Sequence, residues 1–514
     1  MSDVSEQIFG SGSSGAGGSG TPLQPVGKPK VSAVSIVVAI LVGLAAIAGV
    51  VVVVRLGMLP TRALIGLIVG EVILTGLAIG LLLSSSPSRH PVRFWLSAVL
   101  ALALIVGNAI GVKIGMDGVR FVEDIQAPTS DTVLFDVVVL KQGPTDVGQL
   151  TGSTMGEVAS DPLAKAVHDK IATMVQVQYA DQTTWDAAVD ALVDGTVPSI
   201  VLRDGFLQIL AGARSDNESL AQKYDKLTVL TSFEVDSSLA VSPTPIVTPT
   251  PSATPTPTAA TNAYVVYISG IDTDGSISNR SRSDVNMLMV VNPDTGKVLL
   301  VNTPRDYYVQ LRGRSGLPDK LTHAGTYGID VSVGTLEDLY GIPIQYYLRV
   351  NFSSLVTVVD ALGGVEVTSA YDFTYGGYTF TTGTNHLDGK AALAFSRDRH
   401  DFAGGDRVRG ENQQRVITGI IKKLTDPAVL SNYPAVLAAV QSSIQTSMPP
   451  DVIAAQVRQQ LTTGRAWQVT SISVDGTSAL DYTYSYPGQR LYVMVPDQAT
   501  VDAAKDQINA TLHG

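Results

Sequence analysis

Apolar positions are concentrated near the start of the chain. They form three long runs, over Val31–Val54, Ala63–Leu83 and Phe94–Val112. Each run is close to the ~20 residues that a helix needs to cross the hydrocarbon core of a bilayer. Residues 1–30 are instead rich in Gly, Ser and Pro and hold too few apolar side chains to fold. The pattern predicts a disordered cytoplasmic tail over residues 1–30, followed by three transmembrane helices within residues 31–113.

Basic residues beside the runs predict the direction in which the chain crosses the membrane. One side holds four of them, Lys28, Lys30, Arg89 and Arg93. The opposite side holds Arg55, Arg62 and Lys113, so the positive-inside bias is modest and favours a cytoplasmic N-terminus. Three crossings then place everything after Lys113 outside the cell, as part of a multi-pass protein of the cell membrane.

The runs contain one ionisable residue, Glu71 in the second, and one amide, Asn108 in the third. An ionisable residue inside a membrane span is a candidate functional site. The runs hold no further acidic or basic residue that could pair with Glu71. Hydrogen bonding between helices is therefore the interpretation that we favour.

A first soluble segment, residues 118–239, has mixed character. Val133–Leu140 and Pro198–Leu202 have the apolar pattern of buried strands, whereas Asp161–Met174 and Thr184–Leu192 have helical spacing. This predicts a small α/β accessory domain. Parts of it are weakly similar to one lobe of extracellular solute-binding proteins, so ligand sensing and a spacer or docking role both remain open.

A linker over residues 240–261 follows, in which Pro alternates with Ser and Thr. Such a composition cannot form a core and favours an extended, stiff stalk. The linker therefore marks a domain boundary before residues 262–514.

The last region, residues 262–514, alternates strands with helices. Predicted strands are Ala263–Ile271, a hairpin of Val285–Asn292 and Val298–Val301, then Tyr346–Val350, Trp467–Val474 and Leu491–Val495. Predicted helices are Phe352–Leu362, Gly389–Phe395, Gln413–Leu424, Ala435–Ile444 and Pro450–Leu461. The expected fold is an α/β domain of the layered α+β kind.

Composition narrows the functional classes. The chain has 514 residues and no cysteine, which excludes disulfides and thiolate metal sites. Its formal net charge of -11 argues against nucleic acid as a partner, because proteins that bind nucleic acid carry a basic surface. Its mean hydropathy of +0.23 is high for a soluble protein and agrees with a membrane location.

Against this acidic background, the segment Ser396–Gln414 is rich in arginine. It contains Arg397, Arg399, Arg407 and Arg409. Converging guanidinium groups match the oxygens of phosphates bidentately, so such a cluster suits a pyrophosphate. A solvated loop with ion pairs to Asp398, Asp401 and Asp406 is the alternative for the segment taken alone.

Carboxylates and arginines also recur where predicted strands begin or end. They are Asp272, Arg282, Asp284, Arg305 and Asp306. In open α/β sheets ligands bind at strand ends, so these groups and the arginine segment could share one cleft. Asp272 and Asp284 supply the hard oxygen ligands that Mg²⁺ or Mn²⁺ takes, and arginines neutralise a diphosphate during phosphoryl transfer. Separate structural ion pairs are the alternative.

Five motifs in order carry a family resemblance. They are GID at 270–272, RSDVNML at 282–288, NTPRD at 302–306, DKLTHA at 319–324 and SRDRHDFAGGDRVRGENQQR at 396–415. This set resembles the LytR-CpsA-Psr family of extracellular cell-wall enzymes. The resemblance implies a phosphotransferase that moves a glycopolymer from an undecaprenyl-pyrophosphate carrier onto peptidoglycan or a related wall acceptor, with hydrolysis of the pyrophosphate as a side activity.

Position by position, the resemblance implies roles for individual residues. Asp272 and Asp284 would hold the metal ion. The pyrophosphate group would be lined by Arg282, Arg305, Arg397, Arg399, Arg409 and Gln413. The catalytic set would be Asp272, Asp284, Arg305 and Asp398, with the three aspartates as candidates for the general base.

One position departs from the family pattern. Asn412 stands where many members have a further arginine, and Arg407 or Arg415 could compensate for the lost charge. The predicted helix continues with an apolar stripe, Val416, Ile417, Ile420, Ile421 and Leu424. This stripe is either core or, as the family's lipid tunnel implies, a polyprenyl contact.

Two other classes of function are alternatives to glycopolymer transfer. A polyprenyl-pyrophosphate-binding sensor would use the same arginines without turnover. A transcription regulator is disfavoured, because the predicted cytoplasmic tail is short and offers no helix to read DNA.

Overall fold

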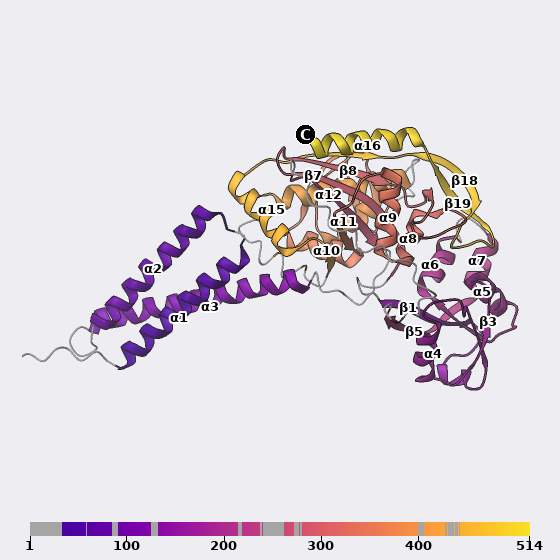
Figure 1. Cartoon of the computed structure of the whole chain (residues 1–514), viewed down its shortest axis with the longest axis horizontal. Coiled ribbons are helices and arrows are strands. Elements are labelled where there is room, and N and C mark those ends of the chain that lie inside the picture. Colours follow the sequence, from indigo (N-terminus) through magenta and orange to yellow (C-terminus); the bar gives the residue numbers. More distant parts are fainter. Residues whose placement is uncertain are drawn as a thin grey trace, which may run out of the picture. The chain divides into compact units, whose positions relative to one another are not determined.

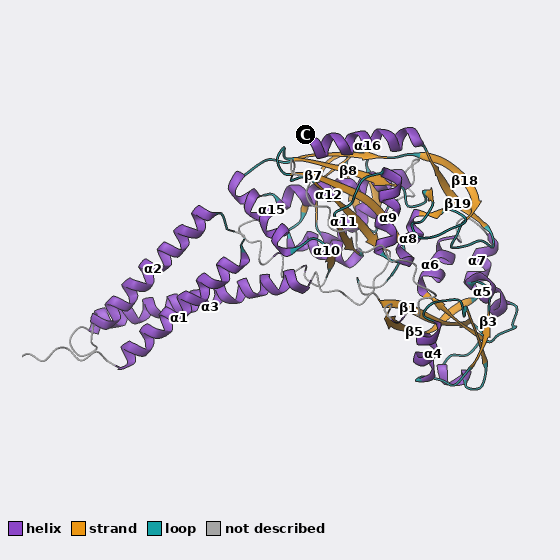
Figure 2. Cartoon of the chain, viewed as in Figure 1, coloured by secondary structure: helices purple, strands orange, loops and turns teal. Residues whose placement is uncertain are grey.

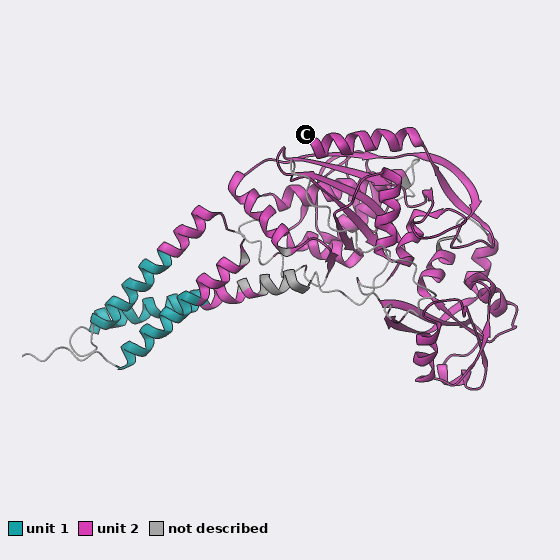
Figure 3. Ribbon diagram, viewed as in Figure 1, with its two compact units in different colours: residues 1–47, 70–108 teal, residues 48–69, 109–514 magenta. Residues whose placement is uncertain are grey.

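The computed structural model describes residues 33–57, 59–84, 91–124, 132–213, 218–236, 262–271, 280–398, 406–426 and 443–514, together with the single positions 239, 277, 429, 436 and 440. Contacts divide the chain into two compact units (Figure 3), Met1–Ile47 with Gly70–Asn108 and Ala48–Val69 with Ala109–Gly514. The predicted tail over residues 1–30 and the predicted linker over residues 240–261 lie outside the described residues.

The three apolar runs form helices, as predicted. These are α1 (Ala33–Leu56), α2 (Thr61–Ser84) and α3 (Pro91–Asp124). Each contains a stretch long and apolar enough to cross a membrane, over Ala33–Arg55, Thr61–Ser84 and Pro91–Lys113. Their apolar side chains are exposed around most of the helix surface, which is the pattern of helices that face lipid. The three helices thus provide a membrane anchor.

The polar residues of the second and third helices meet each other. The Nδ2 atom of Asn108 donates to Oε1 of Glu71 at 2.8 Å and to the carbonyl oxygen of Leu104 at 3.0 Å. Thr75 donates to the same carboxyl oxygen of Glu71 at 3.4 Å. Hydrogen bonding between helices, favoured from the sequence, is confirmed.

The first soluble segment is a five-stranded mixed sheet covered by helices (Figure 2). Its elements are β1 (Thr132–Leu140), β2 (Thr154–Glu157), α4 (Ala164–Ala172), β3 (Gln178–Asp181), α5 (Trp185–Val193), β4 (Ser199–Arg203), α6 (Asp204–Ala213), α7 (Glu218–Asp225) and β5 (Leu227–Asp236), with a 3-10 turn at Val147–Leu150. The strand order is β3-β2-β4-β1-β5. Because side chains alternate along β1, Val137 packs with α4 on one face and Val138 packs with α5 and α6 on the other.

The second soluble region is built on a six-stranded mixed sheet of order β16-β11-β6-β7-β8-β17. Its strands are β6 (Tyr264–Ile271), β7 (Ser283–Asn292), β8 (Lys297–Thr303), β11 (Tyr346–Val350), β16 (Ile444–Thr446) and β17 (Gln468–Ser473). β6, β7 and β8 are antiparallel neighbours, β11 and β17 pair in parallel with β6 and β8, and β16 is an antiparallel edge strand beside β11. The predicted β7–β8 hairpin is confirmed, with Gly296 at φ 71° in its turn.

Helices cover both faces of this sheet, so the predicted layered α/β fold is confirmed (Figure 1). One face packs on α8 (Leu321–Tyr327), α9 (Ile329–Tyr340) and α16 (Gln498–His513). The other face packs on α12 (Asp406–Leu424) through Ile417 and Ile421. Further helices among the described residues are α10 (Phe352–Ala361), α11 (Gly389–Arg397) and α15 (Pro450–Thr463).

Short strand pairs complete the region. They are β9 (Tyr308–Val309) with β10 (Asp319–Lys320), β12 (Val365–Ser369) with β15 (Gly383–Leu387), β13 (Phe373–Tyr375) with β14 (Tyr378–Phe380), and β18 (Gly476–Tyr482) with β19 (Arg490–Pro496). One predicted boundary is wrong. The helix expected over Ala435–Ile444 does not reach Ile444, because this residue pairs with Val350 as the first residue of β16.

Candidate functional site: an apolar cavity with an arginine-rich polar end

A cavity of about 1140 Å³ lies on the α12 face of the six-stranded sheet. Every second residue of β6, including Val266, Ile268 and Gly270, lines it, because alternate side chains of a strand face the same side. Most of the remaining lining is aliphatic or aromatic and comes from the sheet and the helices α10, α12 and α15. A cavity of this kind suits a long apolar ligand.

The charged residues of the cavity wall are of predominantly one sign. Among the described lining residues they are Arg282, Arg305, Arg397 and Arg409, against a single carboxylate, Asp284. The cavity therefore combines an apolar interior with cationic groups that need an anion.

Asp284 in β7 lies at the centre of this charged group. Its Oδ2 atom accepts a hydrogen bond from Nη1 of Arg305 at 2.9 Å, and its Oδ1 atom accepts one from Oγ1 of Thr322 at 2.9 Å. Burial acts to raise the pKa of Asp284, but Arg305, Arg282 and Arg409 outweigh burial and hold the pKa well below its usual range. Asp284 is thus ionised throughout the physiological range.

Arg305, which follows β8, lies between two carboxylates. Besides its bond to Asp284, its Nε atom is 3.4 Å from Oδ2 of Asp306. Asp306 is paired in turn with Nζ of Lys320 at 3.1 Å. Burial acts to raise the pKa of Asp306, but Lys320 and Arg305 outweigh it and lower the pKa. This chain of charges fixes the orientation of the Arg305 guanidinium.

The arginine-rich segment contributes side chains to the cavity wall from two helices. Arg397 ends α11, and its guanidinium lies over the ring of Phe352 at 4.2 Å from the ring centroid. Arg409 and Gln413 lie one turn apart in α12, and Nε2 of Gln413 is 3.5 Å from the carbonyl oxygen of Ser396. Since α12 begins at Asp406, earlier than predicted, both residues face the cavity from within a formed helix.

The apolar stripe of α12 continues the same face. Val416, Ile417, Ile420, Ile421 and Leu424 all line the cavity. Their spacing of three and four residues keeps them on one side of the helix, in line with Arg409 and Gln413. One helix therefore presents a polar group at its start and an apolar wall along the rest.

Other predicted residues do not line the cavity or cannot be placed. Asp272 and Arg399 lie outside the described residues. Asp398, directly after α11, is fully buried and is not among the described lining residues. The site is thus drawn from Asp284, Gln413 and the four lining arginines.

The two arginines that could replace the charge missing at Asn412 point elsewhere. Arg407 is paired with Glu411 at 3.6 Å and with Asp475 at 3.4 Å, outside the cavity wall. Arg415 donates to Oδ1 of Asn412 at 2.6 Å and is paired with Glu411 at 3.3 Å. Asn412 itself is fully buried, so its side chain supports α12.

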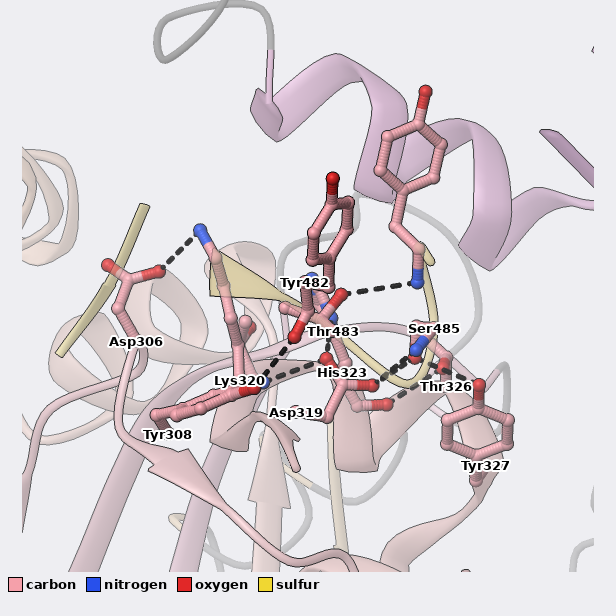
Figure 4. A network of polar contacts seen from close by, with 12 residues as sticks. Asp306, Tyr308, Asp319, Lys320, His323, Thr326, Tyr327, Tyr482, Thr483 and Ser485 are labelled. Atoms are coloured by element: carbon pink, nitrogen blue, oxygen red, sulfur yellow. Dashed lines mark hydrogen bonds and ion pairs between the residues drawn. The ribbon is translucent and has the colours of Figure 1, made fainter. Parts of the chain in front are cut away.

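The DKLTHA motif builds the support beneath the site (Figure 4). Asp319 accepts hydrogen bonds from Nδ1 of His323 at 2.6 Å and from the backbone nitrogen of Ser485 at 2.9 Å. Ser485 belongs to the loop between β18 and β19, so the motif ties this hairpin to α8. No role for Thr322 was predicted from the sequence, and the structure shows that its hydroxyl donates to Asp284.

The fold and the cavity together define a membrane-anchored α/β protein whose apolar cavity carries four arginines in its wall. A sequence model of the LytR_cpsA_psr family matches residues 229–509, which is more than half of the chain. The chain therefore belongs to the LytR-CpsA-Psr family.

Some proteins that are similar to this chain have names that state a reaction. The chain is 35% identical over 238 residues, 46% of its own length and 75% of the relative, to "Polyisoprenyl-teichoic acid--peptidoglycan teichoic acid transferase TagU" of Bacillus cereus strain AH820. It is 38% identical over 191 residues, 37% of this chain and 62% of the relative, to the protein of the same name from Enterococcus faecalis. Among solved structures, TagV of B. subtilis aligns at 23% identity with a TM-score of 0.43, covering 49% of this chain and 98% of that one.

Proposed function

We propose that this protein is a membrane-anchored phosphotransferase that moves a glycopolymer from an undecaprenyl-pyrophosphate carrier onto peptidoglycan or a related wall acceptor. The observation that carries the proposal is the junction of four arginines with an apolar cavity of about 1140 Å³. The cavity suits the polyprenyl chain, and the arginines suit the diphosphate that joins the chain to its sugar. Relatives named as teichoic acid transferases support the reaction class.

In the proposed reaction, a hydroxyl oxygen of the acceptor bonds to the phosphorus that carries the glycopolymer. The bond from this phosphorus to the bridging oxygen breaks, and undecaprenyl phosphate leaves with the electron pair. Arg282, Arg305 and Arg409 offset the charge that gathers on the leaving phosphate, which is the usual protein contribution to phosphoryl transfer.

The hydroxyl proton needs a base, and Asp284 suits this role poorly. A general base works best when its pKa is near the working pH, whereas the arginines hold the pKa of Asp284 well below the usual range even though burial opposes them. Its permanent negative charge fits a metal ligand better. Of the two other candidates, Asp398 is fully buried and does not line the cavity, and Asp272 is the second proposed metal ligand, so no base is assigned.

The proposed metal is Mg²⁺ or Mn²⁺, held by Asp284 with Asp272. Mg²⁺ binds through one or two carboxylates and completes its shell with phosphate oxygens and water. Asp284 fits this pattern, because each of its oxygens accepts one hydrogen bond, from Arg305 or from Thr322, and retains a further lone pair. Within the described parts of the chain no group of three or more metal-ligating side chains gathers, so substrate oxygens would complete the set. The metal ion would offset part of the negative charge of the diphosphate.

The proposal places the catalytic region outside the cell. Three membrane-spanning helices support this placement if the N-terminus is cytoplasmic, as the flanking lysines and arginines predict. Peptidoglycan, the acceptor named for the relatives, is reached from that side.

Turnover by the full-length protein in detergent tests the proposal. With a lipid-linked glycan pyrophosphate, a peptidoglycan acceptor and Mg²⁺, we expect glycan transfer and release of polyprenyl phosphate. Asp284→Ala and Arg305→Ala should each lower turnover by about ten- to a hundredfold, because each removes charge-assisted hydrogen bonds. Arg407→Ala is the matched control, since Arg407 lies on α12 outside the cavity wall.

Three results would contradict transfer. Turnover that is unaffected by both Asp284→Ala and Arg305→Ala would sink the mechanism. Release of polyprenyl phosphate without glycan on the acceptor would indicate a pyrophosphatase. Tight carrier binding with no turnover, despite metal and acceptor, would favour a sensor.

A further inference from the structure

Helix α6 of the first soluble segment reaches the polypeptide that carries Arg282. The Oε1 atom of Gln208 accepts a hydrogen bond from Oγ of Ser281 at 2.9 Å and lies 3.5 Å from the backbone nitrogen of Arg282. Ser281 is only 1% exposed, so this contact is shielded from water. Gln208 thus holds the residue before Arg282 and the backbone of Arg282 itself.

The same backbone is confined from the opposite side by α8. A side chain at Gly325 could not be accommodated, because its Cβ would lie 2.9 Å from the backbone nitrogen of Ser283 and closer still to the carbonyl oxygen of Ser281. The helices α6 and α8 are in contact as well, since a Cβ at Gly205 would lie 3.0 Å from Thr326. The segment 281–283 is therefore held between a helix of each region.

Two carboxyl groups, the partly buried Asp204 and the buried Asp136, orient the Gln208 amide. Asp204, one turn earlier in α6, accepts a hydrogen bond from Nε2 of Gln208. Asp204 is hydrogen bonded to Asp136 of β1, which also accepts from Oγ of Ser232 at 2.7 Å. With the amide nitrogen bound to Asp204, the amide oxygen is directed towards Ser281.

Helices of the first soluble segment also form part of the cavity wall. Ala211, three residues after Gln208 on α6, and Ala221 on α7 both line the cavity. At another point Nε1 of Trp185 donates to the carbonyl oxygen of Ser485 at 2.6 Å, and its ring lies 4.9 Å from that of Tyr486. The two regions share buried contacts at both places.

We propose that Gln208 is a positioning residue of the pyrophosphate site and acts by fixing Arg282. The inference rests on the proposed function, because it assumes that Arg282 binds the diphosphate. It gives the first soluble segment a defined task, which is to complete the carrier-binding site from outside the six-stranded domain. The bound chemistry is that of a prenyl pyrophosphate.

Binding of farnesyl pyrophosphate to the full-length protein in detergent tests this. Gln208→Leu should weaken binding about three- to tenfold, the size expected for one buried hydrogen bond. Ser281→Ala, which removes the hydroxyl on the other side of that bond, should weaken binding by a similar factor. Gln176→Leu is the control, because Gln176 is exposed and its side chain donates to the carbonyl oxygen of Ala172, away from Arg282.

A double-mutant cycle with Arg282→Ala separates positioning from general stability. If Gln208 acts through Arg282, Gln208→Leu has no further effect on binding in the Arg282→Ala background. Effects that multiply in the double variant would overturn the inference, as would wild-type affinity in Gln208→Leu when Arg282→Ala is weakened. Wild-type affinity in Arg282→Ala would instead refute the arginine site of the proposed function, and the inference with it.

Discussion

Gly325 tests how closely α8 must approach the backbone beside Arg282. In Gly325→Ala, the new Cβ would lie closer than 3.0 Å to two main-chain atoms, the oxygen of Ser281 and the nitrogen of Ser283. Neither can shift alone, because β7 begins at Ser283 and Gln208 holds Ser281. We expect overpacking to cost about 1–3 kcal/mol of unfolding free energy, offset by about 1 kcal/mol for replacing Gly with Ala in a helix.

The assay is the thermal midpoint of the full-length protein in detergent, with farnesyl pyrophosphate affinity measured in parallel. The net loss of up to about 2 kcal/mol lowers the midpoint by up to a few degrees in a protein of this size. Gly334→Ala in α9 is the matched control. Its Cβ would approach the side chain of Arg312, which is 42% exposed and can move aside at the cost of surface ion pairs worth little.

A comparison of the two variants can refute the proposed role of the α8 contact. We expect Gly325→Ala to lose both stability and prenyl pyrophosphate affinity, whereas Gly334→Ala stays close to the wild type in both. Equal midpoints and equal affinities in the two variants would show that the contact between α8 and residues 281–283 does not support the site.

Two further predictions concern charged groups. Arg305→Lys keeps the charge but cannot span Asp284 and Asp306, so the affinity for prenyl pyrophosphate should fall about tenfold or more; an unchanged dissociation constant would contradict this. Burial raises the pKa of Asp136 from 3.8 to about 7, with the neighbouring Asp204 adding to the effect. The folded state therefore binds the proton more tightly than the unfolded state, and stability should fall as pH rises from about 4 to about 7 and then level off. Asp136→Asn should flatten this profile in thermal midpoints measured across that range, and an equally steep profile would be evidence against it.

The central strands could be predicted because local sequence patterns determine them. The apolar runs of β6, β7 and β8 are nearly continuous, and the residues Pro293 to Gly296 between the last two carry turn chemistry. The helix α8 was not predicted, because its formation depends on distant partners. Its residue His323 is buried against Asp319, which is itself held by Ser485 from a later hairpin. No periodic pattern in the sequence reports such contacts.

The residues of the candidate site also include some that the sequence could predict and some that it could not. Arg282, Asp284 and Arg305 could be found because they fall within short motifs at strand ends, where the topology brings them together. Gln208 could not be found, since it lies 74 residues before Arg282 and comes from a helix of the other region. Its neighbours in sequence are apolar and typical of any packed helix, so only the tertiary contact distinguishes it.

These contacts also bear on the spacer role, one of the roles left open for the first soluble segment. A spacer needs only to hold the next region at a distance, and its contacts with that region would be few and exposed. Here Trp185 and Tyr486 are 5% and 3% exposed and belong to one hydrophobic cluster with α5 and α6. Separating them would expose two aromatic side chains, each burying about 150–250 Å² at roughly 25 cal/mol per Å². That cost favours a fixed arrangement, in which α6 keeps one geometry relative to Arg282.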